Sequence, residues 1–118
     1  MKFLYMVEYK FAGDAYVPIG VWCVGDTPGL DVEIRMLPDY PEEQEEADWI
    51  INRLVENGVE HVGREFLEYH QGTLSPYRGM RSKVFETEAY PNREALFADL
   101  LKQIRDGRIR PGSNGGVQ

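Results

Sequence analysis

The apolar positions are densest in the first quarter of the chain, where two segments carry hydrophobic residues on both faces. Residues 2–11 place aromatic and aliphatic side chains on one face, and their other face changes from apolar to polar, while residues 16–24 are apolar throughout. A segment that is apolar on both faces suits a central strand covered on two sides. Residues 12–15 between them are short enough for a hairpin. We expect an antiparallel hairpin on which the rest of the chain docks.

Pro18 and Gly20 interrupt the second of these strands. Because Pro18 cannot donate a backbone hydrogen bond and Gly20 has no side chain to pack, we expect a bulge or a break in pairing there. Residues 25–29 form a turn, Gly-Asp-Thr-Pro-Gly. Residues 30–37 then alternate between apolar and charged positions, which is typical of a strand with one face in water. The three strands predict an antiparallel meander.

A helix is predicted over residues 41–57. Pro41 suits the first helical position, and the glutamates that follow suit the positive end of the helix dipole. Apolar residues at positions 47, 50, 51, 54 and 55 form one stripe at helical spacing, and Gly58 ends the helix. Trp49 lies beside the centre of this stripe. Two placements are open for it, one against the edge of the sheet and one exposed as an anchor for a partner.

The second half of the chain is less regular. Residues 59–71 fit a helix and a strand about equally, and residues 82–90 are typical of a strand. Asn92 caps a last helix that ends at Gly107. The pattern predicts an α+β fold with a single domain over residues 1–110. Its antiparallel sheet would consist of the N-terminal three-stranded meander and a later strand, with two or three helices packed on one face. Residues 111–118 have nothing to bury, and we expect a disordered tail.

The composition is that of a globular domain. Of its residues, 42% are hydrophobic and 28% are charged. A chain of 118 residues is long enough to bury a core without disulfides or metals. The lone cysteine, Cys23, lies in the most apolar strand, where it is expected to be a core residue and fits a reducing cytosol. The chain starts directly with a strand, and no apolar run approaches the ~20 residues of a membrane helix. We expect a cytoplasmic protein that binds no membrane.

The net charge of −7 is concentrated in one region. Residues 39–60 contain eight acids and one base, whereas residues 78–110 contain eight bases and five acids. Binding to nucleic acid needs a cationic footprint, which this balance does not favour. An acidic helix facing a basic protein partner fits it better.

Two stretches of the hairpin match a known pattern, Tyr-Met-Val-Glu-Tyr at residues 5–9 and Tyr-Val-Pro-Ile-Gly-Val at residues 16–21. They resemble a family of small uncharacterised bacterial proteins that begin with a Tyr-rich strand, a short turn and a Phe-Val-Asn-Val-Gly-Val strand. Residues 90–97 are similar to the closing turn and helix of that family, while Pro18 stands where the family has asparagine. The family has no settled function, so the resemblance implies a bacterial or phage accessory protein and no activity.

Two clusters of side chains are candidates for ligand binding. On a helix, His61, Glu65 and Glu68 would share one face, and with His70 they could hold a divalent metal; the alternative is a solvated polar face. The second cluster is basic and could bind an anionic ligand or the acidic helix of a second copy, the alternative being solvated loop charges. It consists of Arg78, Arg81 and Lys83.

No motif of catalysis or cofactor binding is recognisable, so we expect no catalytic residue and no cofactor. We expect a non-enzymatic protein-binding accessory protein of the inhibitor, immunity or anti-defence type, which presents its acidic helix to a basic partner. The partner-binding residues would be Glu42, Glu43, Glu45, Glu46, Asp48 and Trp49. One alternative is a small enzyme or ligand-binding protein built on residues 61–70, with or without a divalent metal. A further alternative is a self-assembling structural protein, such as a homodimer that pairs the acidic helix with the basic region of a second copy.

Overall fold

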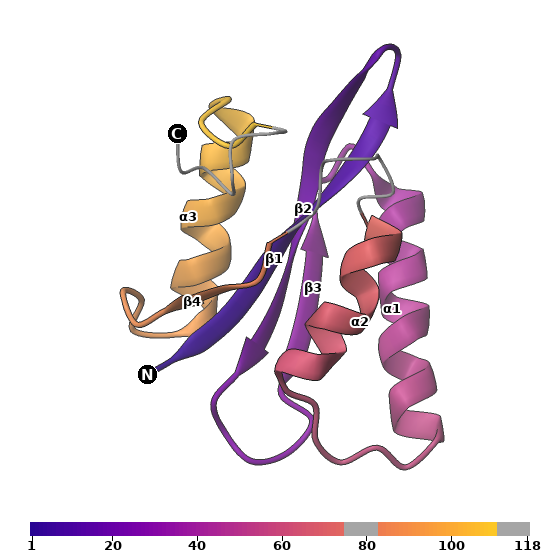
Figure 1. Cartoon of the computed structure of the whole chain (residues 1–118), viewed down its shortest axis with the longest axis vertical. Coiled ribbons are helices and arrows are strands. Elements are labelled where there is room, and N and C mark those ends of the chain that lie inside the picture. Colours follow the sequence, from indigo (N-terminus) through magenta and orange to yellow (C-terminus); the bar gives the residue numbers. More distant parts are fainter. Residues whose placement is uncertain (75–82, 111–118) are drawn as a thin grey trace.

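The computed structural model describes residues 1–74 and 83–110 of the chain. In chain order its elements are β1 (Phe3–Ala12), β2 (Ala15–Gly25), β3 (Val32–Met36), α1 (Pro41–Glu56), α2 (Arg64–Leu74), β4 (Phe85–Thr87) and α3 (Arg93–Arg105). The strands form one antiparallel sheet in the order β3-β2-β1-β4, and the helices pack against it (Figure 1). This arrangement confirms the predicted α+β class, including the N-terminal meander and the later strand.

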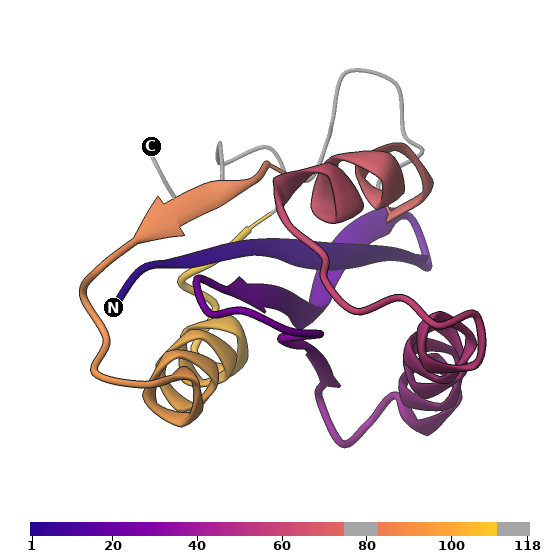
Figure 2. The same ribbon diagram turned by 90° about the horizontal axis from the view of Figure 1, so that it is seen from below.

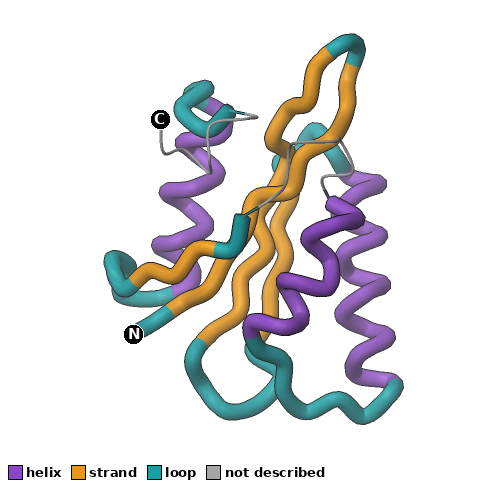
Figure 3. The backbone as a smooth tube through the Cα atoms, in the orientation of Figure 1, coloured by secondary structure: helices purple, strands orange, loops and turns teal. Residues whose placement is uncertain are grey.

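The centre of the sheet is the predicted hairpin of β1 and β2. Its register runs from Phe3 opposite Gly25 to Ala12 opposite Ala15. β3 pairs with the inner half of β2, and β4 adds three residues beside the start of β1. The tip of the hairpin therefore extends beyond both edge strands, as Figure 3 shows.

The irregularity expected at Pro18 and Gly20 is present as a bulge. The pairing shifts between Glu8, which lies opposite Gly20, and Tyr9, which lies opposite Pro18. A Cβ atom at Gly20 would lie 2.4 Å from the Met36 sulfur, so β2 and β3 can approach each other here only at a glycine. The bulge separates the regular inner half of the hairpin from its projecting tip.

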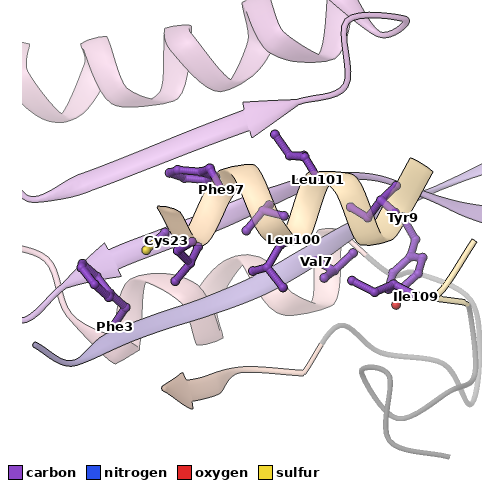
Figure 4. Close-up of a cluster of buried hydrophobic side chains, with 11 residues drawn as sticks. Phe3, Val7, Tyr9, Cys23, Phe97, Leu100, Leu101 and Ile109 are labelled. Carbon is purple, nitrogen blue, oxygen red and sulfur yellow. The ribbon is translucent and has the colours of Figure 1, made fainter. Parts of the chain in front are cut away.

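Helices cover both faces of the sheet, which corrects the expectation of one covered face. α3 packs on the face that carries Phe3 and Cys23, where Phe97 is fully buried (Figure 4). α1 and α2 pack on the opposite face, over Met6 and Trp22 (Figure 2). The physical reason is the apolar character of β1 and β2 on both faces, because burying both faces requires a cover on each side.

α1 confirms the predicted helix, and the Gln44 side chain joins it to the edge of the sheet through two hydrogen bonds. Its buried residue, Ala47, packs against the sheet. The Gln44 Oε1 atom accepts a hydrogen bond from the Met36 N–H (2.8 Å), and its Nε2 atom donates one to the Ile34 carbonyl (3.0 Å). These bonds occupy backbone groups of the edge strand β3. They also fix the rotation of α1, which decides which of its acids face the sheet.

The ambiguous segment 59–71 is a loop followed by α2. Leu67 is fully buried, and Phe66 and His70 lie half-buried above the sheet, which is helical spacing. The strand predicted over residues 82–90 is much shorter in the structure, since only the three residues of β4 pair with β1. The predicted tail, residues 111–118, lies outside the described residues.

The last helix, α3, begins at the predicted cap. The Asn92 side chain accepts a hydrogen bond from the Ala95 N–H at 2.8 Å. The buried residues of α3 are Leu96, Phe97, Leu100, Leu101 and Ile104.

Within residues 1–74 and 83–110, no helix has the length and apolar character needed to cross a membrane.

Candidate functional site

A cleft of about 420 Å³ opens between α1 and α2 on their common face of the sheet. Figure 2 shows these two helices on either side of the region above β1 and β2. The lining residues come from both central strands and from both helices. They are Glu8, Trp22, Glu43, Glu46, Ala47, Trp49, Ile50 and His70.

The floor of the cleft is a hydrogen-bonded pair from β1 and β2. The Trp22 indole Nε1 donates to the Glu8 carboxylate at 2.8 Å. The two residues are diagonal neighbours across the strands, since Glu8 lies opposite Gly20 and Trp22 follows two positions later. Trp22 is 1% exposed, so this pair belongs to the core on one side and to the cleft on the other.

The Glu8 carboxyl is held in an environment that disfavours its charge. Its removal from water raises the pKa of Glu8 to about 7, and the negative charges of Glu46 and Glu43 act in the same direction. The Trp22 hydrogen bond and the Lys10 ammonium oppose this rise in pKa. At neutral pH the carboxyl is therefore divided between its neutral and ionised forms. Carboxyl groups with such a pKa cluster at functional sites.

His70 forms an aromatic wall of the cleft. Its ring centroid lies 4.9 Å from that of Trp22 and 4.9 Å from that of Phe66. Tyr69, which is 79% exposed, contacts the same imidazole ring from outside. Burial lowers the pKa of His70, which favours the neutral form of the imidazole.

Acids of α1 form the rim on the other side. Glu43 forms an ion pair with the Lys10 ammonium of β1, which lowers the pKa of Glu43. Within the described part of the chain, Glu42, Glu45 and Glu46 enter no salt bridge. The first turns of α1 thus present carboxylates that no described side chain neutralises.

The partner-binding residues predicted from sequence divide between two sides of α1. Glu43, Glu46 and Trp49 line the cleft, whereas Asp48 accepts a hydrogen bond from Gln44 Nε2 at 3.1 Å on the side of β3. Trp49 takes the exposed one of its two predicted placements, with 59% of its surface accessible. Its ring lies 5.4 Å from the Arg53 guanidinium carbon.

The predicted metal ligands are not brought together. His61 is exposed in the loop before α2, Glu65 and Glu68 are exposed on the helix, and His70 lies over Trp22. The shared helical face required His61 to be inside the helix, but α2 begins three residues later, at Arg64. In residues 1–74 and 83–110, no three His, Cys, Asp or Glu side chains are grouped to hold a metal ion.

The predicted anion-binding cluster is described only at its end. Arg78 and Arg81 lie outside the described residues. The Lys83 ammonium lies 5.7 Å from the Phe85 ring centroid, next to β4 and not at the cleft. Anion binding therefore stays a prediction.

Sequence reasoning missed the floor of the cleft. Glu8 was assigned to the face of the first strand that becomes polar, and Trp22 to an apolar strand without a role. The available signal was a lone acid among apolar residues in a strand whose neighbour is apolar on both faces. Such a carboxyl needs a buried donor, and the cross-strand register identifies that donor as Trp22.

Comparisons of the chain with family models, with curated proteins and with solved structures found no match. The resemblance of residues 5–9 and 16–21 to a family of small bacterial proteins stays a hypothesis. A function has to be argued from the site, because a fold class alone does not imply one.

Proposed function

We propose that this protein is a non-enzymatic accessory protein that binds a partner protein with a basic surface. The binding surface is the cleft side and outer side of α1, and we call it the α1 surface: Glu42, Glu43, Glu45, Glu46 and Trp49. The observation that carries the proposal is the position of an exposed tryptophan next to carboxylates that no described residue neutralises. Inhibitor, immunity and anti-defence proteins are the class of function that such a surface suits.

The charges of the α1 surface support a role in association. Glu42 and Glu45 are exposed and form no salt bridge with any described residue, and Glu42 acts on the Lys10 ammonium only through the charge between them. Carboxylates close together on a surface repel one another, and a basic partner relieves that repulsion. Such complementarity accelerates encounter and selects the partner more than it increases affinity.

Trp49 supports the same proposal by supplying apolar contact area. A tryptophan that is 59% exposed leaves a large apolar side chain in water, and tryptophan is among the residues that contribute most to binding energy at interfaces. Val55, six residues further along the same helix, is 60% exposed. The α1 surface therefore combines one large exposed apolar side chain with the carboxylates that precede it along the helix.

The test is affinity capture from lysate of the source organism, with charge-reversed variants. The α1 variant carries E42K and E45K, which reverse two charges of the α1 surface. The matched control, D26K and E88K, makes the same change in net charge at two exposed acids away from α1. We expect wild type and control to retain the same stoichiometric protein, and the α1 variant to lose it.

Salt and cross-linking complete this test. A partner held by the α1 surface should leave as ionic strength rises from ~0.05 to ~0.3 M, because exposed charges are screened over shorter distances. Its cross-links to this chain should join basic residues of the partner to α1. Equal retention by the α1 variant and the control, or cross-links confined to the face covered by α3, would contradict the proposal.

A further inference from the structure

We propose that the cleft between α1 and α2 receives one arginine side chain of the partner, with its guanidinium between the Trp49 and His70 walls and the Glu8 and Glu46 carboxylates. This inference rests on the proposed function and specifies what enters the cleft. It follows from three properties of the lining residues, which are their charge, their aromatic character and their depth.

The charge of the lining favours a cation. Of the eight lining residues within the described part of the chain, three are glutamates and none is lysine or arginine. The Lys10 ammonium pairs with Glu43 at the rim, which leaves Glu46 and the Glu8 carboxyl facing the cleft without a described cation bound to them. A negatively charged recess with partly apolar walls attracts a cation more strongly than an open surface does, because water screens the charges less.

The aromatic walls favour a planar cation. Trp22, Trp49 and His70 are among the lining residues, and Trp49 and His70 are the more exposed of the three. Trp49 already accepts a guanidinium of its own chain, since the Arg53 guanidinium carbon lies 5.4 Å from its ring centroid. Guanidinium groups stack on aromatic faces and are more weakly hydrated than ammonium groups, so they lose less on entering a recess.

Depth and carboxylate geometry favour arginine over lysine. The volume of about 420 Å³ is within the usual range of small-molecule sites, which admits a long side chain together with its adjoining backbone. The Glu8 carboxylate lies at the floor, where the Trp22 indole already binds one of its oxygens at 2.8 Å. A guanidinium fork can reach this floor and the rim carboxylate of Glu46 together, whereas a lysine supplies one compact charge.

Binding of the guanidinium in the cleft should be coupled to deprotonation of the Glu8 carboxyl. The groups that face this carboxyl are the Trp22 indole from β2, Lys10 from β1, Glu43 and Glu46 from α1, and the His70 ring from α2. With a pKa of about 7, a fraction of Glu8 carries a proton at neutral pH. An entering guanidinium favours the ionised form, so binding releases that proton and strengthens as the pH rises from 6 to 8.

The experiment titrates the full chain with the capped tripeptide Gly-Arg-Gly and follows the indole N–H signals of Trp22 and Trp49 by two-dimensional NMR. The chain has two tryptophans, one at the floor and one at the rim, so both depths are reported. Gly-citrulline-Gly is the matched control peptide, because citrulline keeps the shape of arginine without its charge. We expect a millimolar dissociation constant for the arginine peptide, roughly tenfold weaker binding of the lysine peptide, and no saturable shift with citrulline.

Two variants locate the effect. E8Q keeps an oxygen for the Trp22 indole and removes the charge, so we expect arginine-peptide binding to weaken roughly tenfold and to lose its dependence on pH. E88Q removes one charge from an exposed residue away from α1 and outside the cleft, and should change binding less than about twofold. Each variant is compared with wild type at pH 6 and pH 8.

The outcomes separate this inference from the proposed function. An unmoved Trp22 signal, or equal shifts with arginine and citrulline, would refute the arginine cleft but leave the capture test on E42K and E45K standing. Methylguanidinium that binds as tightly as the peptide would refute a partner's side chain as the occupant in favour of a free small cation. Equal retention of the partner by the E42K and E45K variant and by its control, together with intact tripeptide binding, would refute the proposed function instead.

Discussion

Replacing Glu8 by glutamine should make the protein more stable at alkaline pH and barely change it at pH 5. The pKa of Glu8 is raised from 4.5 to about 7 by burial, so the folded chain holds this proton more tightly than the unfolded chain does. The contribution of Glu8 to stability is therefore fully present below about pH 4.5 and is lost as the pH rises through 7. At ~1.4 kcal/mol per pKa unit, the loss amounts to about 3 kcal/mol.

The variant E8Q removes this loss because glutamine resembles the protonated acid. Its amide oxygen can still accept the hydrogen bond that the Trp22 indole donates at 2.8 Å. At pH 5 we expect the free energies of unfolding of E8Q and wild type to agree within about 1 kcal/mol. At pH 8.5 we expect E8Q to be more stable by about 2–3 kcal/mol, the lower value allowing for the water that still reaches the half-buried carboxyl.

Urea denaturation followed by tryptophan fluorescence measures both values, since Trp22 leaves the core on unfolding. The control is E45Q, which removes an exposed carboxylate of α1 that forms no salt bridge with any described residue. It should differ from wild type by less than about 0.5 kcal/mol at both pH values. If E8Q and E45Q respond alike to pH, the account of Glu8 as a desolvated carboxyl is wrong.

Three further predictions concern the fold, and each is measured as a shift of the urea midpoint. G20A should cost about 1–3 kcal/mol because its Cβ would lie 2.4 Å from the Met36 sulfur, whereas G63A, whose Cβ would meet nothing closer than 3.8 Å, should change stability by less than about 1 kcal/mol; equal effects would contradict the close approach of β2 and β3. N92A should cost about 1 kcal/mol through loss of the α3 cap, N92D should largely restore it, and an unchanged midpoint for N92A would contradict the cap. F97A should cost about 3–5 kcal/mol because this side chain is fully buried, and a loss below about 1 kcal/mol would mean that α3 is not packed on the sheet.

Local patterns predicted most of the elements. The hairpin, the bulge at Pro18 and Gly20, the acidic helix and the Asn92 cap each depend on residues close together in sequence, and the structure confirms each of them. The short β4 shows where local patterns stop. Residues 82–90 have the composition of a strand, but composition does not say how many of them find a partner on β1.

The placement of helices and the floor of the cleft depend on contacts between distant residues. The apolar faces of β1 and β2 already implied two covered faces, but the stripes of the helices do not say which face each one covers. Glu8 and Trp22 are 14 residues apart, and their meeting depends on the hairpin register and on the bulge beside it. A one-residue change of register would turn one of them to the opposite face of the sheet.

The burial of Glu8 links stability to binding. A neutral side chain at this position would relieve the folded protein of a carboxyl that disfavours its own ionised form at neutral pH. The same carboxyl lies at the floor of a cleft whose described lining contains no lysine or arginine, so a cation that enters the cleft offsets part of the cost of burying the charge. Removing the charge should therefore stabilise the free protein and weaken cation binding together. Such opposite effects of one substitution are expected of a group retained for function, because a group that served only the fold would lose stability when replaced.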